Sequence, residues 1–174
     1  MTDIIKIEDL EEVRTQLETV NKYQQLVQKL LVKDVDYGII PGTNKPTLLK
    51  PGAEKLAKIH GLVDEYELIK VIENWEKPFF YYMFKCRLKH ANTGIVVSEG
   101  IGSCNSLETK YRWKKGKNGR VENDEVYTIV NTIAKMAKKR AMVDAVLSAC
   151  RLSAIYTQDV EDLGLDFSEE IDAK

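Results

Sequence analysis

Residues 126–151, VYTIVNTIAKMAKKRAMVDAVLSACR, constrain the fold more than any other stretch of the sequence. Apolar side chains recur along this stretch at intervals of three and four, which is the pattern of a long amphipathic helix. Small residues within the apolar side, such as Ala137 and Ala141, would let a sheet approach the helix closely. The stretch therefore predicts one long helix whose apolar side packs on strands that come earlier in the chain.

The middle of the chain predicts those strands. Residues 65–72 are rich in branched and aromatic side chains, and residues 79–89 alternate with a period of two. A tight turn at 92–94 and a new apolar run at 95–97 indicate a hairpin. We therefore expect an antiparallel β-meander. Its core face consists of Phe80, Tyr82, Phe84, Cys86 and Leu88.

Gly100 and Gly102 follow the expected hairpin. A GxG after a strand invites a nucleotide-binding interpretation, but the third glycine of that fingerprint is absent, and no GK[ST] motif occurs in the chain. We expect the two glycines to let the chain turn or bulge as it leaves the sheet.

Two further helices are expected before the meander. Residues 8–33 have the apolar spacing of an amphipathic helix, which packs on the chain's own core or forms a seam with a second subunit. Residues 51–60 predict a short helix that begins at Pro51 and ends at Gly61. Residues 34–50 predict a loop or short hairpin that turns at 41–44.

These elements together predict an α+β fold, in which an antiparallel β-meander packs against a long helix and an additional amphipathic helix lies at the N-terminus. Three segments follow from this pattern: the N-terminal helix (1–33), an α+β core (34–156) and an acidic tail (157–174). The tail is too poor in apolar residues to join the core firmly, so we expect it to be disordered or to mask a basic surface.

The composition restricts the location of the protein. No apolar run is long enough to span a membrane, and the first residues, MTDIIKIEDLEEV, are too acidic for a signal peptide. The three cysteines lie far apart and form no CxxC pair, which favours reduced, partly buried thiols over a zinc site. We therefore expect a cytoplasmic protein that makes no contact with a membrane.

The sequence contains little that indicates catalysis. Its two histidines stand apart, and no nucleophile motif or metal-ligand spacing is present, so we expect a non-enzyme without cofactor or metal. One alternative stays open, namely a metal-dependent nuclease built on Glu65, Glu67 and Glu73.

The charge of the chain is segregated, although its net charge is only −1. Residues 110–120 contain six basic side chains and no acidic one, and residues 159–172 contain seven acidic side chains and no basic one. The aromatic rings of Tyr111 and Trp113 lie among these cations. Cations that bind phosphates and rings that stack on unpaired bases together suit single-stranded nucleic acid.

Within the long helix, Lys135, Lys138 and Lys139 share one face, whereas Arg140 and Arg151 lie on another side, where Arg140 and Asp144 have the spacing of an ion pair. Two cations of the expected meander, Lys85 and Arg87, lie on its outer face. The candidate nucleic-acid-binding residues are Lys45, Lys50, Lys55, Lys85, Arg87, Lys110, Tyr111, Arg112, Lys114, Lys115, Lys135, Lys138, Lys139, Arg140 and Arg151.

Three stretches together resemble the Rad-type single-strand annealing proteins of double-strand-break repair, and in particular their Sak-type phage branch. They are KPTLLKPGAEKLAKIHGL (45–62), YYMFKCRLKHANTGIVVSEGIG (81–102) and KKRAMVDAVLSACR (138–151). In this sequence Leu147 and Ser148 stand where a Lys-Arg pair is common in the family, and the basic residues come earlier in the helix.

The resemblance implies a β-meander crossed by a helix, and subunits that assemble into rings or filaments. It also implies single-stranded DNA in a positive groove with its bases exposed, and it would place Lys50 or Lys55 and also Arg151 at that groove. We therefore expect a phage or bacterial homo-oligomer that binds and anneals single-stranded DNA in recombination and repair, through a groove formed between subunits. The alternative is a protein-interaction module, such as a phage factor that acts on a host protein.

Overall fold

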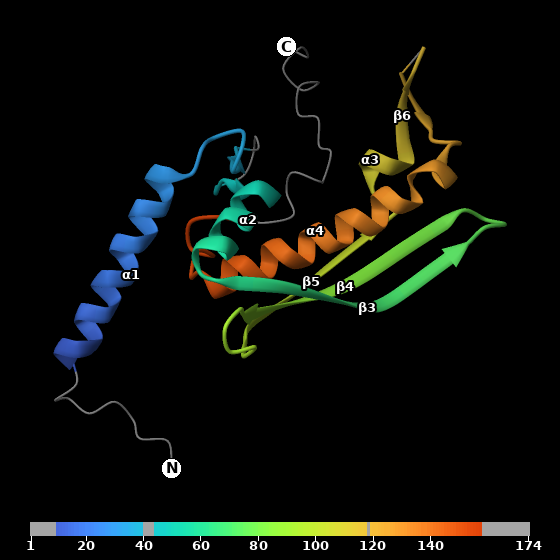
Figure 1. The fold of residues 1–174 in the computed structure, drawn as a ribbon. Coiled ribbons are helices and arrows are strands. Elements are labelled where there is room, and N and C mark those ends of the chain that lie inside the picture. Colours follow the sequence, from blue (N-terminus) through green and yellow to red (C-terminus); the bar gives the residue numbers. More distant parts are fainter. Residues whose placement is uncertain (1–9, 40–43, 118, 158–174) are drawn as a thin grey trace, which may run out of the picture.

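The computed structural model describes residues 10–39, 44–117 and 119–157. A three-stranded sheet lies under one long helix, and smaller elements surround the two (Figure 1). The predicted α+β class, with a β-meander packed against a long helix and an additional N-terminal helix, is confirmed. The elements are α1 (Leu10–Leu30), β1 (Tyr37–Gly38), β2 (Thr47–Leu48), α2 (Lys50–Ile59), β3 (Leu62–Asn74), β4 (Phe79–His90), β5 (Val96–Asn105), α3 (Thr109–Arg112), β6 (Trp113–Gly116), β7 (Gly119–Glu122), η2 (Val126–Ile129) and α4 (Val130–Ala149).

The sheet is an antiparallel meander in the order β3-β4-β5, as predicted. Of the predicted core face of β4, Phe84 is half-buried and the other four side chains are buried. Gly94 makes the tight turn before β5 with a φ of 69°, a left-handed conformation that glycine adopts without strain. The sheet therefore has one face that joins the core and one outer face.

α4 lies on the core face of the sheet, and two glycines of β5 bring the helix backbone close to it. A Cβ atom on Gly100 would lie 2.3 Å from the amide nitrogen of Ala145, and one on Gly102 would lie 2.2 Å from that of Ala141. The prediction that these glycines turn or bulge the chain out of the sheet is wrong. They lie inside β5, because only a strand without side chains there admits the helix so closely.

The long helix is shorter at both ends than the apolar pattern predicts. Its first turn is a 3₁₀ helix, η2, and α4 ends at Ala149. Arg151 follows in a left-handed conformation with a φ of 57°, and the amide of Leu152 then donates to the Leu147 carbonyl at 3.0 Å. The helix stops here because this reversal returns the fully buried side chain of Leu152 to the core.

α1 touches the rest of the molecule mainly through its C-terminal half (Figure 1). Val27 is the buried residue of this helix, and the Tyr23 hydroxyl lies 2.8 Å from Nε2 of His60. Leu10 and Leu17 are 53% and 60% exposed. Part of the predicted apolar stripe thus packs on the chain's own core, while its N-terminal part faces solvent.

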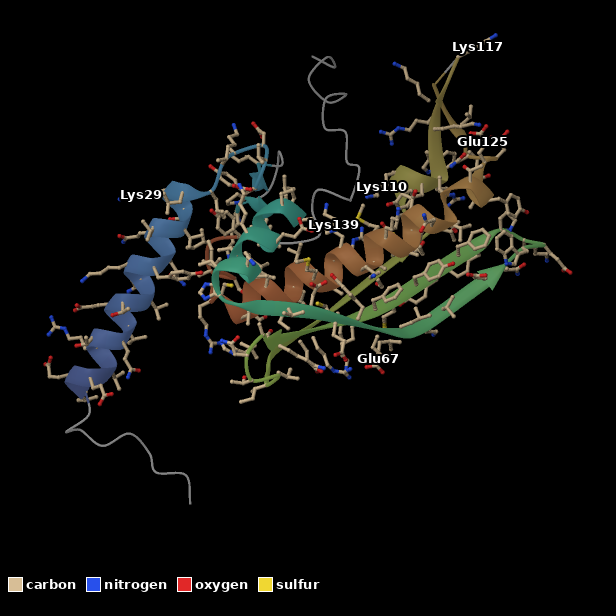
Figure 2. All side chains as sticks on the ribbon, in the orientation of Figure 1. Lys29, Glu67, Lys110, Lys117, Glu125 and Lys139 are labelled. Carbon is tan, nitrogen blue, oxygen red and sulfur yellow. The ribbon has the colours of Figure 1, made fainter. Side chains whose placement is uncertain are left out.

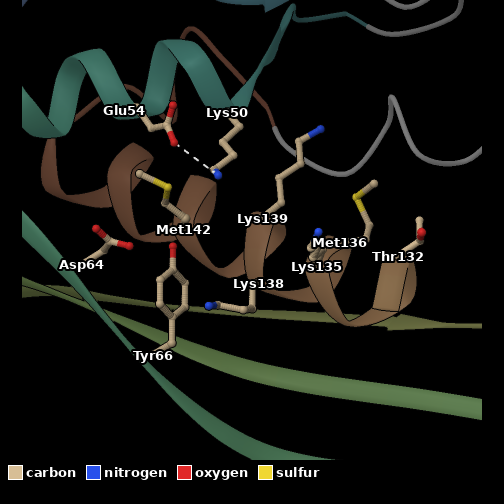
Figure 3. A pocket seen from close by; sticks show the side chains of 10 residues that line it. All are labelled: Lys50, Glu54, Asp64, Tyr66, Thr132, Lys135, Met136, Lys138, Lys139 and Met142. Atoms are coloured by element: carbon tan, nitrogen blue, oxygen red, sulfur yellow. Dashed lines mark ion pairs between the residues drawn. The ribbon is translucent and has the colours of Figure 1, made fainter. Parts of the chain in front are cut away.

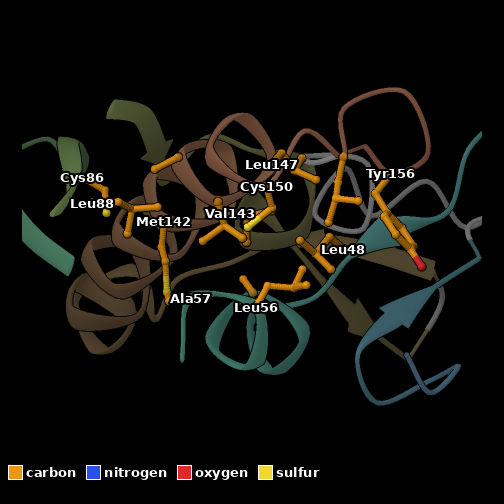
Figure 4. Packing of buried hydrophobic residues seen from close by; sticks show 14 of the residues in the cluster. Leu48, Leu56, Ala57, Cys86, Leu88, Met142, Val143, Leu147, Cys150 and Tyr156 are labelled. Carbon is orange, nitrogen blue, oxygen red and sulfur yellow. The ribbon is translucent and has the colours of Figure 1, made fainter. Parts of the chain in front are cut away.

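α2 forms as predicted, with Pro51 in its first turn and Gly61 after its end, where the glycine has a φ of 62°. It packs on the C-terminal half of α4, and Leu56 meets Val143 and Leu147 in the core around Leu48 (Figure 4). This core fixes α2 beside α4, which matters for the site described below.

Residues 34–50 contain the short antiparallel hairpin β1–β2. Its predicted turn lies largely in residues 40–43, outside the described residues. Thr157 donates from its amide to the Pro46 carbonyl at 2.9 Å. The remainder of the predicted acidic tail, from residue 158 onward, and the masking role expected for it also lie outside the described residues.

The three cysteines are free and buried, as predicted. Burial raises the pKa of the Cys86 thiol to about 12 and that of the Cys150 thiol to about 11, so both stay protonated at neutral pH. Across the described ranges, no helix is long and apolar enough to cross a membrane.

Candidate functional site

A groove of about 660 Å³ lies between α2, α4 and the edge strand β3 (Figure 3). We call it the lysine groove. α2 contributes two of its side chains, β3 two and α4 six. Its lining consists of Lys50, Glu54, Asp64, Tyr66, Thr132, Lys135, Met136, Lys138, Lys139 and Met142.

The lysine groove is electropositive. Among the described residues of its lining, four lysines face two carboxylates. One carboxylate is engaged locally, because Lys50 Nζ lies 3.2 Å from Oε1 of Glu54 one turn further along α2. Charges of one sign in a concave, partly apolar site concentrate the field, so the groove attracts anions.

The packing of α4 decides where these lysines point. Ala137, Ala141 and Ala145 are fully buried, and the glycines of β5 lie against the backbone at these positions. The face with Lys135 and Lys139 is therefore turned away from β5, and both side chains line the groove (Figure 3). The structure thus brings together the predicted lysine face of α4 and the predicted Lys50 of α2 within one chain.

Tyr66 is the aromatic side chain of the groove, and it rises from β3 toward Met142 (Figure 3). The ammonium group of Lys138 lies 4.2 Å from the centre of the Tyr66 ring, a cation–π contact. Burial, followed by a hydrogen bond with Asp64, raises the pKa of Tyr66 well above its usual range. The Tyr66 hydroxyl therefore stays protonated at physiological pH, and the side chain carries no charge.

Two other predicted lysines near α2 hold the chain together. Lys55 Nζ lies 2.8 Å from both carboxylate oxygens of the fully buried Asp36. Burial alone would raise the pKa of Asp36, but Lys55 and the Val32 amide outweigh that effect and lower it. Lys45 donates to the Ser153 carbonyl at 3.1 Å. Neither lysine lines the groove.

The predicted cations of β4 lie on the outer face of the sheet and are neutralised there. Arg87 donates to Glu99 at 2.7 Å and to Glu67 at 2.6 Å, and Lys85 lies 3.6 Å from Glu99. The hydrogen bond from Arg87 is the main cause that lowers the pKa of Glu99. Lys85 and Arg87 thus belong to a ladder of ion pairs across three strands, on the side of the sheet opposite α4.

Arg140 connects α4 to α3. Its two terminal nitrogens each donate to a carboxylate oxygen of Glu108 at 2.8 Å, and one of them also donates to the Ser103 carbonyl at 2.5 Å. The side chains of Arg140 and Glu108 are only 13% and 20% exposed. Asp144, which has the helical spacing of an ion pair with Arg140, accepts from the amide of Ile101 at 2.9 Å.

The basic stretch 110–120 forms α3 and the hairpin β6–β7, which stands away from the sheet (Figure 2). Tyr111 is buried at 8% exposure and belongs to the core, so it offers no free stacking face. Lys110 lies over the Tyr111 ring at 4.8 Å.

At the base of the hairpin, Arg112 of α3 lies 3.2 Å from Glu122 and 5.1 Å from the centre of the Trp113 ring. Lys114 pairs closely with Asp124, and Lys115 is exposed. Two of the predicted cations are thus engaged with carboxylates close by, and none of the hairpin residues lines the lysine groove.

Arg151 follows α4 beside α1, where its carbonyl accepts from Gln24 at 2.6 Å. Because α4 ends before it, Arg151 lies outside the lining of the lysine groove, whereas Lys135 and Lys139 belong to the other half of the helix.

The sequence did not single out Tyr66, Met136 or Met142 as groove residues. The period of β3 places Tyr66 on one face of the strand, but a bulge between Leu68 and Lys70 shifts the register after it. The pairing of Tyr66 with the buried Cys86 places Tyr66 on the face of the sheet that meets α4, and this pairing is not visible in the sequence.

The carboxylates considered for a nuclease have other partners. Glu65 pairs with Lys89, Glu67 with Arg87, and Glu73 accepts from the Tyr82 hydroxyl. In the described part of the chain, no three or more His, Cys, Asp or Glu side chains group in a way that suits a metal ion.

Comparison with models of known protein families and with curated protein sequences finds no match for this chain.

Proposed function

We propose that this protein is a non-catalytic, homo-oligomeric protein that binds single-stranded DNA in the lysine groove and promotes strand annealing in recombination and repair. The observation that carries the proposal is the convergence of Lys50, from α2, with three lysines of α4 in one concave site. Phosphates are the natural ligands of such a site, because lysine ammonium groups bind them as point charges and release counterions.

The lining also suits a single strand better than a duplex. Tyr66 and the thioethers of Met136 and Met142 present apolar and aromatic surface between the cations. An unpaired strand offers bases to such surface, whereas a duplex keeps its bases stacked inside.

The resemblance to the Rad-type annealing proteins supports the annealing and assembly parts of the proposal. Two of its three stretches, 45–62 and 138–151, contribute α2 and the second half of α4, and both border the groove. Strands held extended by phosphate contacts meet their complements at a lower entropic cost.

The test replaces Lys135, Lys138 and Lys139 together by alanine and measures binding of a labelled oligo-dT across a range of salt concentrations. Three fewer phosphate contacts should reduce the slope of log K against log salt by about 2, because each contact to a single strand contributes about 0.7. At low salt we expect affinity to fall about 100-fold, which corresponds to about 1 kcal/mol for each lysine lost.

The matched control replaces Lys22, Lys29 and Lys70, which are exposed and outside the groove, and it should leave the slope unchanged. A second assay mixes the protein with complementary labelled oligonucleotides and measures the rate of annealing. If the wild type shows neither salt-sensitive binding nor faster annealing, or if both triple variants lose affinity equally, the proposal is wrong.

A further inference from the structure

Tyr66 lies at the border between the main core cluster and the lysine groove. Its ring is half-buried, on the edge strand of the sheet, and it contributes to the wall of the lysine groove. Figure 3 shows the ring between Asp64 and Lys138, pointing up toward Met142. The ring therefore packs against the edge of the main core cluster and also lies among the cations of the groove.

One contact of the ring is a cation–π contact with Lys138. Lys138 Nζ lies 4.2 Å from the ring centre, so the ammonium group rests on the aromatic face. A cation–π contact at a partly exposed site is weaker than an ammonium–phosphate contact in the same groove, because the phosphate carries a full negative charge. A phosphate that enters the groove can thus draw Lys138 away from Tyr66.

We propose that Tyr66 is a stacking platform for one unpaired nucleobase, and that Lys138 covers this platform in the empty groove and moves to a phosphate when a strand binds. This inference rests on the proposed function and deepens it. Met142 lies at the hydroxyl end of the ring (Figure 3), Met136 belongs to the same lining further along the groove, and thioethers adapt to flat ligands of different shape. The ligand class is a single strand of any sequence, because every base has a π-face.

The platform accounts for two properties at once. A base in a duplex is stacked on both faces, so it cannot reach Tyr66 without leaving the helix, and the groove thereby selects unpaired strands. Stacking occupies only the face of a base and leaves its pairing edge open. A strand held in this way can still meet its complement, as annealing requires.

The experiment is a double-mutant cycle between Tyr66 and the nucleobases. Wild type, Tyr66→Leu and Tyr66→Phe are titrated with fluorescein-labelled dT oligonucleotides and with oligonucleotides of equal length that contain only abasic sites. We expect Tyr66→Leu to weaken binding of dT by about 5- to 100-fold, the range of one lost base–aromatic stack, and to change binding of the abasic strand little. Tyr66→Phe keeps the ring and should stay close to wild type on both strands.

The salt slope separates this role from the role of the lysines. Tyr66→Leu removes no charge, so its slope should equal that of wild type although its affinity is lower. Equal losses on dT and abasic strands, or an equal loss for Tyr66→Phe and Tyr66→Leu, overturn the platform while leaving the lysine groove as a phosphate site.

If the wild type binds neither strand in a salt-dependent way, the proposed function fails and the platform fails with it. Thermal unfolding of each variant checks the fold. Should Tyr66→Leu not fold, Tyr66→Ile, whose branched side chain suits an edge strand, takes its place in the same cycle.

Discussion

The two sides of the molecule use the same residue types in opposite ways. In the lysine groove, Lys135, Lys138 and Lys139 of α4 face Lys50 of α2, and the described part of the lining adds two carboxylates, Glu54 and Asp64. On the outer face of the sheet, Lys85, Arg87 and Lys89 alternate with Glu65, Glu67 and Glu99 of the neighbouring strands, and ion pairs join the two sets. Among the described residues, the groove gathers more cations than carboxylates, whereas the outer face joins the two in ion pairs.

The difference shows that a cluster of cations in sequence says little about a binding surface until its neighbours in space are known. A strand places each side chain opposite one on the next strand, so Arg87 meets both Glu65 and Glu99 directly. Side chains three and four apart on a helix share one face, so the three lysines of α4 stay together and face an element that brings a further lysine.

The largest effect is expected at Gly102, where α4, which contributes most of the groove lining, packs closely on the sheet. Gly102→Ala would place a Cβ atom 2.2 Å from the Ala141 nitrogen and 2.4 Å from the Ala137 carbonyl oxygen, so α4 must shift or lift. We expect a loss of about 3 kcal/mol in the free energy of unfolding, measured in urea, and weaker DNA binding. Ser103→Ala, at the adjacent position on the opposite face of β5, serves as the control. A Gly102→Ala variant as stable as wild type would contradict the close packing.

A smaller loss in the free energy of unfolding is expected when a buried ion pair is broken, and a smaller one still for an exposed pair. Arg140→Ala leaves Glu108 in a site where its side chain is 20% exposed, and we expect a loss of about 2 kcal/mol in the free energy of unfolding. Arg87→Ala, the matched change in the solvent-facing ladder, should cost clearly less, because water and the remaining cations screen its carboxylates. Urea unfolding of both variants measures the difference. Equal losses would show that the two arginines serve equivalent structural roles.

The smallest effect is expected from substitutions that remove the difference in ion pairing between the groove and the outer face of the sheet. Glu65→Gln, Glu67→Gln and Glu99→Gln together would free Lys85, Arg87 and Lys89 on the outer face. We expect the low-salt affinity for oligo-dT to rise about tenfold and the salt slope to steepen by up to about 2, since three cations become available to phosphates. The same substitutions at Glu11, Glu12 and Glu18, which are exposed on α1, control for net charge. An identical gain in the control would mean that only net charge matters.

Much of the fold could be predicted because its patterns are local. The alternation along β4 identified its core face, the turn residues identified the hairpin to β5, and the proline and glycine at its ends identified α2. The same reasoning failed at Gly100 and Gly102, because a glycine that ends a strand and one that admits a helix look alike in sequence.

The candidate site could be predicted only in part. The shared face of Lys135, Lys138 and Lys139 follows from helical spacing, and Lys50 was also among the predicted residues. Arg140 and Lys55 have the same chemistry, but their partners, Glu108 and Asp36, are 32 and 19 residues away in the chain. Long-range ion pairs of this kind have no local signature, so the sequence could not distinguish a structural cation from one that faces a ligand.

The sequence by itself thus determined the main helices, the meander and the buried face of β4, since these depend on residues a few positions apart. Only the tertiary structure decided which cations line the groove and which join ion pairs on the outer face, because that depends on which elements the packing brings together. It also decided the place of Tyr66, since the pairing of β3 with β4 puts the ring under α4, where Lys138 covers it.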